Sequence, residues 1–268
     1  AKKIADIAPG DLNNVFFTTG GSTAVDTALR TVHFFNNRLG RRDKKIILAR
    51  EKGYHGSTYL ASTVTGKARD KNRFDVESRL VRFLPDVNPY VRPAGMTEAE
   101  WCDEKVADLE AMIDSVGADN IGGFIAEPIL CSGGVIIPPD GYHKRTFDIC
   151  RAHDILYISD EVVTAFGRIG HWFASESEFG IVPDMITCAK GLTSGYLPLG
   201  ACIISDRVMD RMTGPDQDML FSNGYTYSAH PVSCAAALKN IAIIEDEQIL
   251  EHVKAVSPHF QKRLQELR

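Results

Sequence analysis

Two charged side chains follow apolar stretches that predict buried strands, at residues 155–159 and 185–188. Asp160 ends the first stretch and Lys190 follows the second, and ligands bind beyond such strand ends in open α/β sheets. An ionised Asp can keep the ring nitrogen of a heterocyclic cofactor protonated, which makes the ring an electron sink. A partly desolvated lysine forms imines with aldehydes. The alternatives are a helix cap or salt bridge for Asp160 and a solvated surface position for Lys190.

A glycine turn precedes a predicted helix near the start of the chain. Gly20-Gly21-Ser22-Thr23 follows an apolar run at 15–17. Backbone amides, a hydroxyl and the positive end of a helix therefore converge where a phosphate can bind. The sequence matches neither the dinucleotide fingerprint nor the Walker pattern. A plain glycine turn with Ser22 as the helix N-cap is the alternative interpretation.

Two further segments carry groups that suit a planar, phosphorylated ligand. Tyr54 and His55 precede Gly56, and an aromatic ring beside a glycine can lie flat on a planar molecule. The alternatives are a core position for Tyr54 and an ordinary surface imidazole for His55. Thr226 offers a hydroxyl in a turn before a helix, or else a simple turn or cap hydrogen bond.

These residues need a sheet that brings strand ends together. Apolar runs predict strands at 15–17, 46–48, 80–84, 121–126, 155–159, 185–188 and 201–204. Helical patterns at 22–37 and 142–153 lie between them, and crossover helices favour parallel strands. We therefore expect an α/β fold with a mostly parallel central sheet and helices on both faces. Residues 86–100 are expected to be irregular, and 231–268 to form a helix that leads toward a second domain.

Composition narrows the function to small-molecule chemistry. The 268 residues are 44% hydrophobic and 24% charged, which is enough for one large α/β domain. The net charge of −5 offers no broad basic surface to nucleic acid or anionic lipid. The six cysteines lack zinc-ligand spacing and suggest reduced core thiols, so we expect no metal. No apolar run reaches the ~18 residues of a membrane helix, and we expect a cytoplasmic protein.

Taken in order, these segments resemble the class III aminotransferases, specifically the ω-amino-acid or amine:pyruvate branch, over nearly the whole chain. The resemblance implies the large domain of a fold type I transferase that uses pyridoxal 5′-phosphate (PLP), at 1–220. It also implies a dimer-contact loop and helix at 221–268, an N-terminal segment ahead of the chain, and a small C-terminal domain that carries the substrate-carboxylate arginine. The motifs that carry it are 158–162 with 166–168, the run Ala-Lys-Gly-Leu-Thr-Ser-Gly-Tyr-Leu-Pro-Leu-Gly at 189–200, Thr226-Tyr227 and His230-Pro231.

The resemblance also assigns roles to individual residues. Lys190 would form the Schiff base with PLP, and Asp160 would hold the pyridine nitrogen. A threonine at the position of Thr226 reaches the cofactor phosphate of the neighbouring subunit, which implies a homodimer. The remaining cofactor-binding residues are Gly21 and Ser22 at the phosphate, Tyr54 and Val162 on opposite ring faces, and His55 and Glu127 near the pocket.

Several positions depart from the pattern of the family, and one of them, Val163, stands where glutamate-linked members often carry Gln and thereby resembles the amine:pyruvate branch. Gly20 and Thr23 occupy the outer places of its phosphate loop, which predicts weaker or rearranged phosphate binding through the amides of the two residues between them. Ala165 and Ile169 replace a common glycine and a common threonine near the active-site loop. These departures leave the substrate undetermined.

The reaction that the resemblance implies is transamination. An amino group would pass from an ω-amino acid or amine donor to a keto acid such as pyruvate, by a ping-pong mechanism. An aminomutase of the same fold, a non-catalytic PLP-binding protein and a cofactor-free Schiff-base lysine enzyme are the alternatives.

Overall fold

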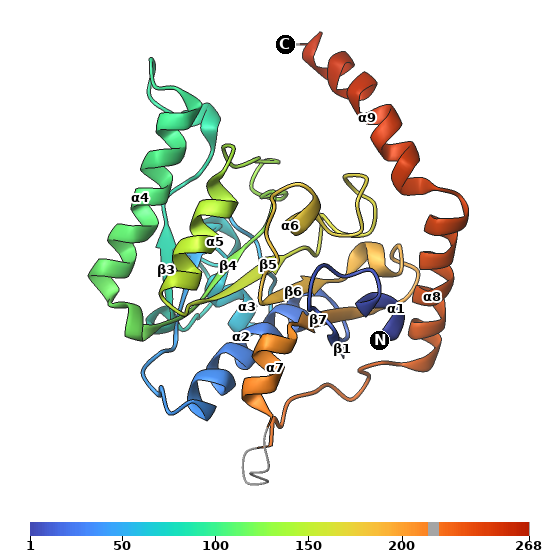
Figure 1. The fold of residues 1–268 in the computed structure, drawn as a ribbon, viewed down its shortest axis with the longest axis horizontal. Coiled ribbons are helices and arrows are strands. Elements are labelled where there is room, and N and C mark those ends of the chain that lie inside the picture. Colours follow the sequence, from blue (N-terminus) through green and yellow to red (C-terminus); the bar gives the residue numbers. More distant parts are fainter. Residues whose placement is uncertain (214–219, 268) are drawn as a thin grey trace.

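A twisted sheet forms the centre of the computed structural model, which describes residues 1–213 and 220–267 (Figure 1). In these residues seven strands follow the order β1-β7-β6-β5-β4-β2-β3. Every strand expected from the apolar runs is present, with each end within two residues of its expected place. The strands are β1 Asn14–Thr18, β2 Ile46–Arg50, β3 Val81–Leu84, β4 Ile121–Ala126, β5 Leu156–Asp160, β6 Met185–Cys188 and β7 Gly200–Ile204.

The expected mostly parallel sheet is confirmed. Strands β3, β2, β4, β5 and β6 are parallel to one another, whereas β7 is antiparallel to both β6 and β1. Because parallel strands present their carboxyl ends at one edge, Asp160 at the end of β5 and Lys190 just after β6 lie at the same edge of the sheet.

Helices cover both faces of the sheet, as expected. Alternate strand residues contribute to different cores: Ile47 packs in the core with α2, α3 and α7, and Leu48 in the core with α4 and α5. A third core joins β6 and β7 to α8. The helices are α1 Lys2–Ala5, α2 Gly21–Arg38, α3 Tyr59–Val64, α4 Glu98–Val116, α5 Tyr142–Ala152, α6 Ala174–Ser177, α7 Asp206–Met212, α8 Pro231–Asp246 and α9 Ile249–Gln265.

The irregular segment expected at 86–100 ends earlier than residue 100. Apart from the 3-10 turn Pro89–Val91, residues 86–97 form no regular element, but α4 begins at Glu98. The N-cap Thr97 accepts a hydrogen bond from the Glu100 backbone amide, and the Glu100 carboxylate accepts one from the Thr97 amide. This capping box starts the helix.

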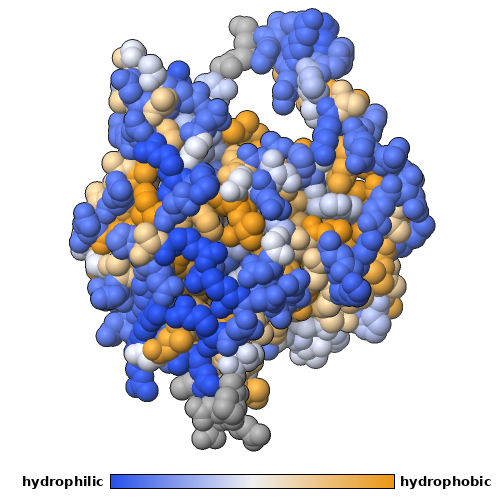
Figure 2. Space-filling view, viewed as in Figure 1, coloured by the Kyte–Doolittle hydropathy of each residue, from blue (hydrophilic) through white to orange (hydrophobic). Residues whose placement is uncertain are grey.

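The single helix expected at 231–268 is wrong. Gln248 adopts a left-handed conformation with φ of 49°, which separates α8 from α9. The turn lets Ile249 and Leu250 pack on the core beside α8, and then α9 extends away from the body (Figure 1). In Figure 2 this helix stands apart as a largely hydrophilic rod. Arg268 lies outside the described residues.

None of the described helices combines the length and the apolar character that crossing a membrane requires.

Candidate active site

A cavity of about 300 Å³ lies at the carboxyl edge of the sheet, where the loops after β2, β4, β5 and β6 meet the start of α2. The structure brings eight of the nine expected cofactor-binding residues to its lining. Thr226, the ninth, does not line it. The lining residues are Gly21, Ser22, Tyr54, His55, Gly56, Glu127, Cys131, Ser132, Asp160, Val162, Val163 and Lys190.

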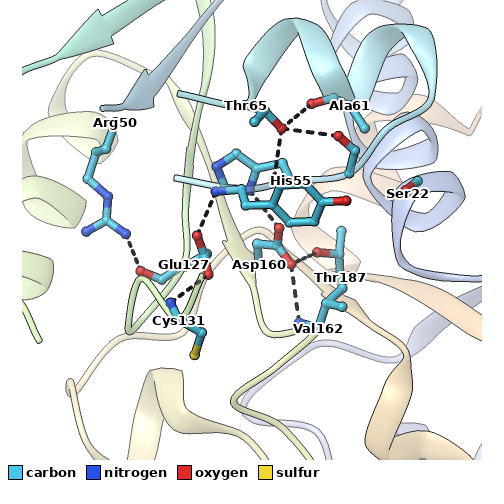
Figure 3. Close-up of polar contacts among 12 residues, drawn as sticks. Ser22, Arg50, His55, Ala61, Thr65, Glu127, Cys131, Asp160, Val162 and Thr187 are labelled. Carbon is cyan, nitrogen blue, oxygen red and sulfur yellow. Dashed lines mark hydrogen bonds and ion pairs between the residues drawn. The ribbon is translucent and has the colours of Figure 1, made fainter. Parts of the chain in front are cut away.

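Asp160 is a buried carboxylate with several fixed partners (Figure 3). Its Oδ2 lies 2.6 Å from His55 Nδ1, and both side chains are at most 3% exposed. Its Oδ1 accepts hydrogen bonds from Thr187 Oγ1 at 3.0 Å and from the Val162 amide at 3.2 Å. The interpretation of His55 as a surface imidazole is therefore wrong. The pair fixes one carboxylate orientation toward the cavity.

His55 is itself held from behind. Its backbone amide donates to Thr65 Oγ1 at 3.0 Å, and that hydroxyl donates to the carbonyl oxygens of Ala61 and Gly56. The end of α3 thus fixes the loop that follows β2. These contacts hold His55 beside Asp160 with little freedom to move, although the two residues are 105 positions apart in the sequence.

Glu127, just after β4, joins two loops at the floor of the cavity (Figure 3). Its Oε1 accepts from the Tyr54 amide at 2.9 Å, and its Oε2 accepts from the Cys131 amide at 3.1 Å. Burial raises the pKa of Glu127, and nearby Asp160 raises it further, while His55 and the buried Arg50 oppose the rise. Arg50 also donates to the Glu127 carbonyl oxygen. Glu127 therefore supports the loops that form the cavity.

The glycine turn places backbone amides, and not a side-chain cap, at the start of α2. The N-cap is Gly20, with no side-chain cap hydrogen bond, so the interpretation of Ser22 as N-cap is wrong. Ser22 Oγ instead accepts from the Ser57 amide at 3.1 Å. Gly56 has φ of 132°, and a Cβ there would lie 2.5 Å from Ser22 Oγ, so only glycine fits the approach. The amides of Gly21 and Ser22 remain at the cavity.

Thr23, one of the departures from the family pattern, faces the turn. Its hydroxyl donates to the Gly20 carbonyl oxygen at 2.9 Å and lies 3.4 Å from Thr19 Oγ1. The Thr23 side chain thus stabilises the first turn of α2 through a hydrogen bond to the backbone of that turn.

Lys190 stands at the open side of the cavity. Its amine has no hydrogen-bond or ion-pair partner among the described residues. The residue has φ of 30°, a left-handed value that non-glycine residues seldom adopt and that occurs often at functional sites. A second hollow of about 410 Å³ shares Lys190 and Gly21 with the first and continues past Gly195 and Tyr196. An unpaired amine between two hollows can reach a ligand in either.

Sequence reasoning missed several residues of the site. Cys131 lines the cavity, so the view of all six cysteines as core thiols is wrong for it, and Cys234 is also only half-buried. All six are free thiols. Thr187 was missed as well, although its place at the end of β6, three residues before Lys190, is a usable signal. In the described residues no group of three His, Cys, Asp or Glu side chains is arranged to hold a metal ion.

The comparisons with known proteins agree on one family. Residues 1–268 match the family described as Aminotransferase class-III. Putrescine–pyruvate aminotransferase of Pseudomonas aeruginosa is 42% identical over 268 residues, which are 100% of this chain and 58% of that protein. The chloroplastic gamma aminobutyrate transaminase 3 of Solanum lycopersicum is 40% identical over 98% of this chain and 51% of its own length.

Solved structures give the same result. The crystal structure of a thermostable (S)-enantioselective omega-transaminase from Thermomicrobium roseum superposes with a TM-score of 0.95 at 35% identity, over 99% of this chain and 59% of that one. An omega-transaminase from Pseudomonas jessenii in complex with PMP gives 0.89 at 37% identity, over 94% and 56%. The chain therefore spans between half and three fifths of the length of these relatives.

Proposed function

This chain belongs to the class III aminotransferases, which depend on PLP, and we propose that it forms the cofactor-binding part of an enzyme that moves amino groups. In this proposal the donor is an ω-amino acid or an amine, the acceptor is a keto acid such as pyruvate, and the kinetics are ping-pong. The single observation that carries it is one cavity lined by a buried Asp–His pair and by a lysine amine that has no partner in the described residues.

The residues of the cavity fit PLP. Gly21 and Ser22 offer backbone amides at the start of α2 for a phosphate. A Cβ on Gly21 would lie 2.9 Å from Val162 Cγ1, so the missing side chain keeps this corner narrow and its amides exposed. Asp160 offers a buried carboxylate for a protonated ring nitrogen. When bound, PLP supplies an aldehyde that takes up amino groups and a ring that accepts electrons from the substrate carbon.

Different side chains of the cavity have different roles in the proposed reaction. Lys190 provides the amine that we assign to cofactor attachment, and after its release its Nζ accepts and returns the proton that moves during transfer. Asp160 keeps the ring nitrogen protonated, and His55 fixes the Asp160 carboxylate through the 2.6 Å contact. Tyr54 and Val162 line the cavity and would limit the access of water to the ring.

We further propose that the working form is a homodimer in which Thr226 contacts the phosphate in the neighbouring copy. Thr226 is exposed and lies outside the cavity of its own chain. The adjacent Tyr227 is 71% exposed, and Tyr196 in the loop after Lys190 is 84% exposed. Exposed aromatic side chains beside a site favour burial against a partner. If sites are shared, a mixed dimer of Lys190→Ala and Thr226→Ala chains contains one intact site, so the mixture should be more active than either variant alone. No gain in activity on mixing would contradict the sharing of sites.

The test of the proposed function is visible absorbance of the purified protein with PLP. We expect a band that an amine donor such as β-alanine removes and that pyruvate restores. Turnover that needs no keto acid would indicate an aminomutase instead. A band that no donor among β-alanine, γ-aminobutyrate and putrescine changes would indicate a binding protein, and no band at all would contradict the assignment of Lys190.

A further inference from the structure

Glu161 follows Asp160 but points away from the cavity into the protein, where it is fully buried. Asp184, the other fully buried carboxylate near β5, is paired with Arg151 and Arg207. Glu161 has no cation within ion-pair distance among the described residues. Burial raises the pKa of Glu161, and hydrogen bonds from neutral groups oppose the rise. A buried carboxylate without a counter-ion needs such donors to be tolerated at all.

The donors to Glu161 come from both ends of one loop. Oε2 accepts from the Ala174 amide at 2.6 Å and from Thr164 Oγ1 at 3.1 Å. Oε1 accepts from the Ser175 amide at 3.0 Å and from Ser175 Oγ. One carboxylate therefore joins the start of the loop 162–173 to the start of α6. The loop ends where α6 begins (Figure 1).

The loop that Glu161 closes packs against both turns of the proposed cofactor site. Val162 packs closely against Gly21, because a Cβ on Gly21 would lie only 2.9 Å from Val162 Cγ1. Phe166, which has φ of 57°, lies against Gly191, where a Cβ would be 2.9 Å from Phe166 Cβ. The loop thus contacts the phosphate turn on one side and the residue after Lys190 on the other.

We propose that Glu161 is a positioning residue that fastens the loop 162–173 and thereby sets the distance between the phosphate turn and the Lys190 turn. The proposal rests on the proposed function for its effect on PLP, whereas the fastening of the loop is independent of any cofactor. Both carboxylate oxygens accept from a backbone amide, so the NH₂ group of a glutamine would face an N–H donor in either orientation.

Trypsin provides the direct test, because Arg168 is exposed in the middle of the loop. Without PLP, we expect Glu161→Gln to be cleaved after Arg168 roughly tenfold faster than the wild type, with other sites unchanged. Thr164→Val, which removes one hydroxyl donor and keeps both amide bonds, should give a smaller increase at the same site. Glu176→Gln, at an exposed carboxylate in α6, is the matched control and should behave as the wild type.

PLP titration is the second readout. We expect Glu161→Gln to raise the dissociation constant for PLP roughly tenfold relative to the wild type. Wild-type cleavage rates in both Glu161→Gln and Thr164→Val would overturn the proposal, and so would faster cleavage at every site equally. If Glu161→Gln does not fold, the rate of cleavage after Arg168 in Thr164→Val alone tests the proposal. If Glu161→Gln is cleaved selectively after Arg168 and the wild type binds no PLP, the proposed function is rejected and the fastened loop is retained.

Discussion

Two sides of the cavity are built in opposite ways. The inner wall, defined here by His55, Glu127 and Asp160, is buried, and each side chain has a partner within the chain. The open side, defined by the 20–22 turn and Lys190, presents backbone amides and an amine that has no partner in the described residues.

This difference means that the inner wall determines the geometry of the cavity, whereas the open side supplies the groups that react with a ligand. Most hydrogen-bonding groups of the inner wall have partners inside the protein, so the inner wall holds one geometry. The open side keeps its capacity for a ligand. Changes on the open side should therefore affect chemistry with little effect on folding, whereas changes that remove a hydrogen-bonding partner from the inner wall or from the residues behind it should affect both.

The largest expected effect is that of Lys190→Ala on the open side. We expect turnover to fall at least about 1,000-fold, because the substitution removes both the attachment group and the proton carrier. The free energy of unfolding should change by less than about 0.5 kcal/mol, because the exposed side chain makes no polar contact with the described residues. Initial rates and urea unfolding measure the two effects. Substantial unfolding of this variant would break the distinction between the two sides.

The next effect is that of Asp160→Asn in the inner wall. Asparagine can accept from Thr187 and donate to His55, so the fold and cofactor binding should persist. Turnover should fall roughly a hundredfold or more, because a neutral amide does not keep a ring nitrogen protonated. Turnover near the wild-type level would show that the Asp160 charge has no part in the reaction.

A third effect concerns the support behind the inner wall. His143 lies 3.0 Å from Tyr157 Oη and 2.9 Å from the Pro128 carbonyl oxygen, and burial lowers its pKa from 6.5 to about 3. Its stabilising contribution is therefore complete above pH 6.5. The contribution falls by about 1.4 kcal/mol per pH unit as the pH drops toward 3, because the unfolded chain gains a proton that native His143 does not.

Urea unfolding between pH 7 and pH 4 measures this contribution. The gap in unfolding free energy between the wild type and His143→Gln should narrow as the pH falls. A gap that is constant over this range would mean that native His143 takes up protons as readily as the unfolded chain.

The smallest effect is at the phosphate turn. Gly21→Ala should raise the dissociation constant for PLP roughly tenfold, because its Cβ would lie 2.9 Å from Val162. Gly20→Ala is the matched control, since nothing lies within 4 Å of a Cβ there and its φ of 169° is ordinary extended backbone. Equal affinities in the two variants would show that the contact between Gly21 and Val162 does not shape the site.

Most of the fold could be predicted from the sequence, and so could the position of Asp160 and Lys190 at strand ends, because strand ends are local features. Asp160 and Lys190 each follow an apolar run, and every expected strand is present. The contacts between segments that are distant in the sequence could not be predicted from such local features. His55 meets Asp160 only because β2 and β5 lie on either side of β4 in the sheet, and no spacing in the chain records that neighbourhood.

Local geometry also overrode local patterns at particular residues. Ser22 has the residue type of an N-cap, but the helix starts one residue earlier and its hydroxyl bonds to Ser57. The apolar pattern after Pro231 continues across Gln248, yet the backbone turns there so that Leu250 can pack on the body. In both cases, contacts with residues distant in the sequence determined the local structure.

The most direct test of the central claim is to locate the lysine that bonds to PLP. Borohydride reduction of the purified protein with PLP makes the bond permanent, and peptide mass spectrometry then identifies the modified residue. We expect a single modified lysine, Lys190, and we expect the modification to be lost when an amine donor is added before reduction. Modification mainly at other lysines, or modification of Lys190 that the donor does not reduce, would contradict it.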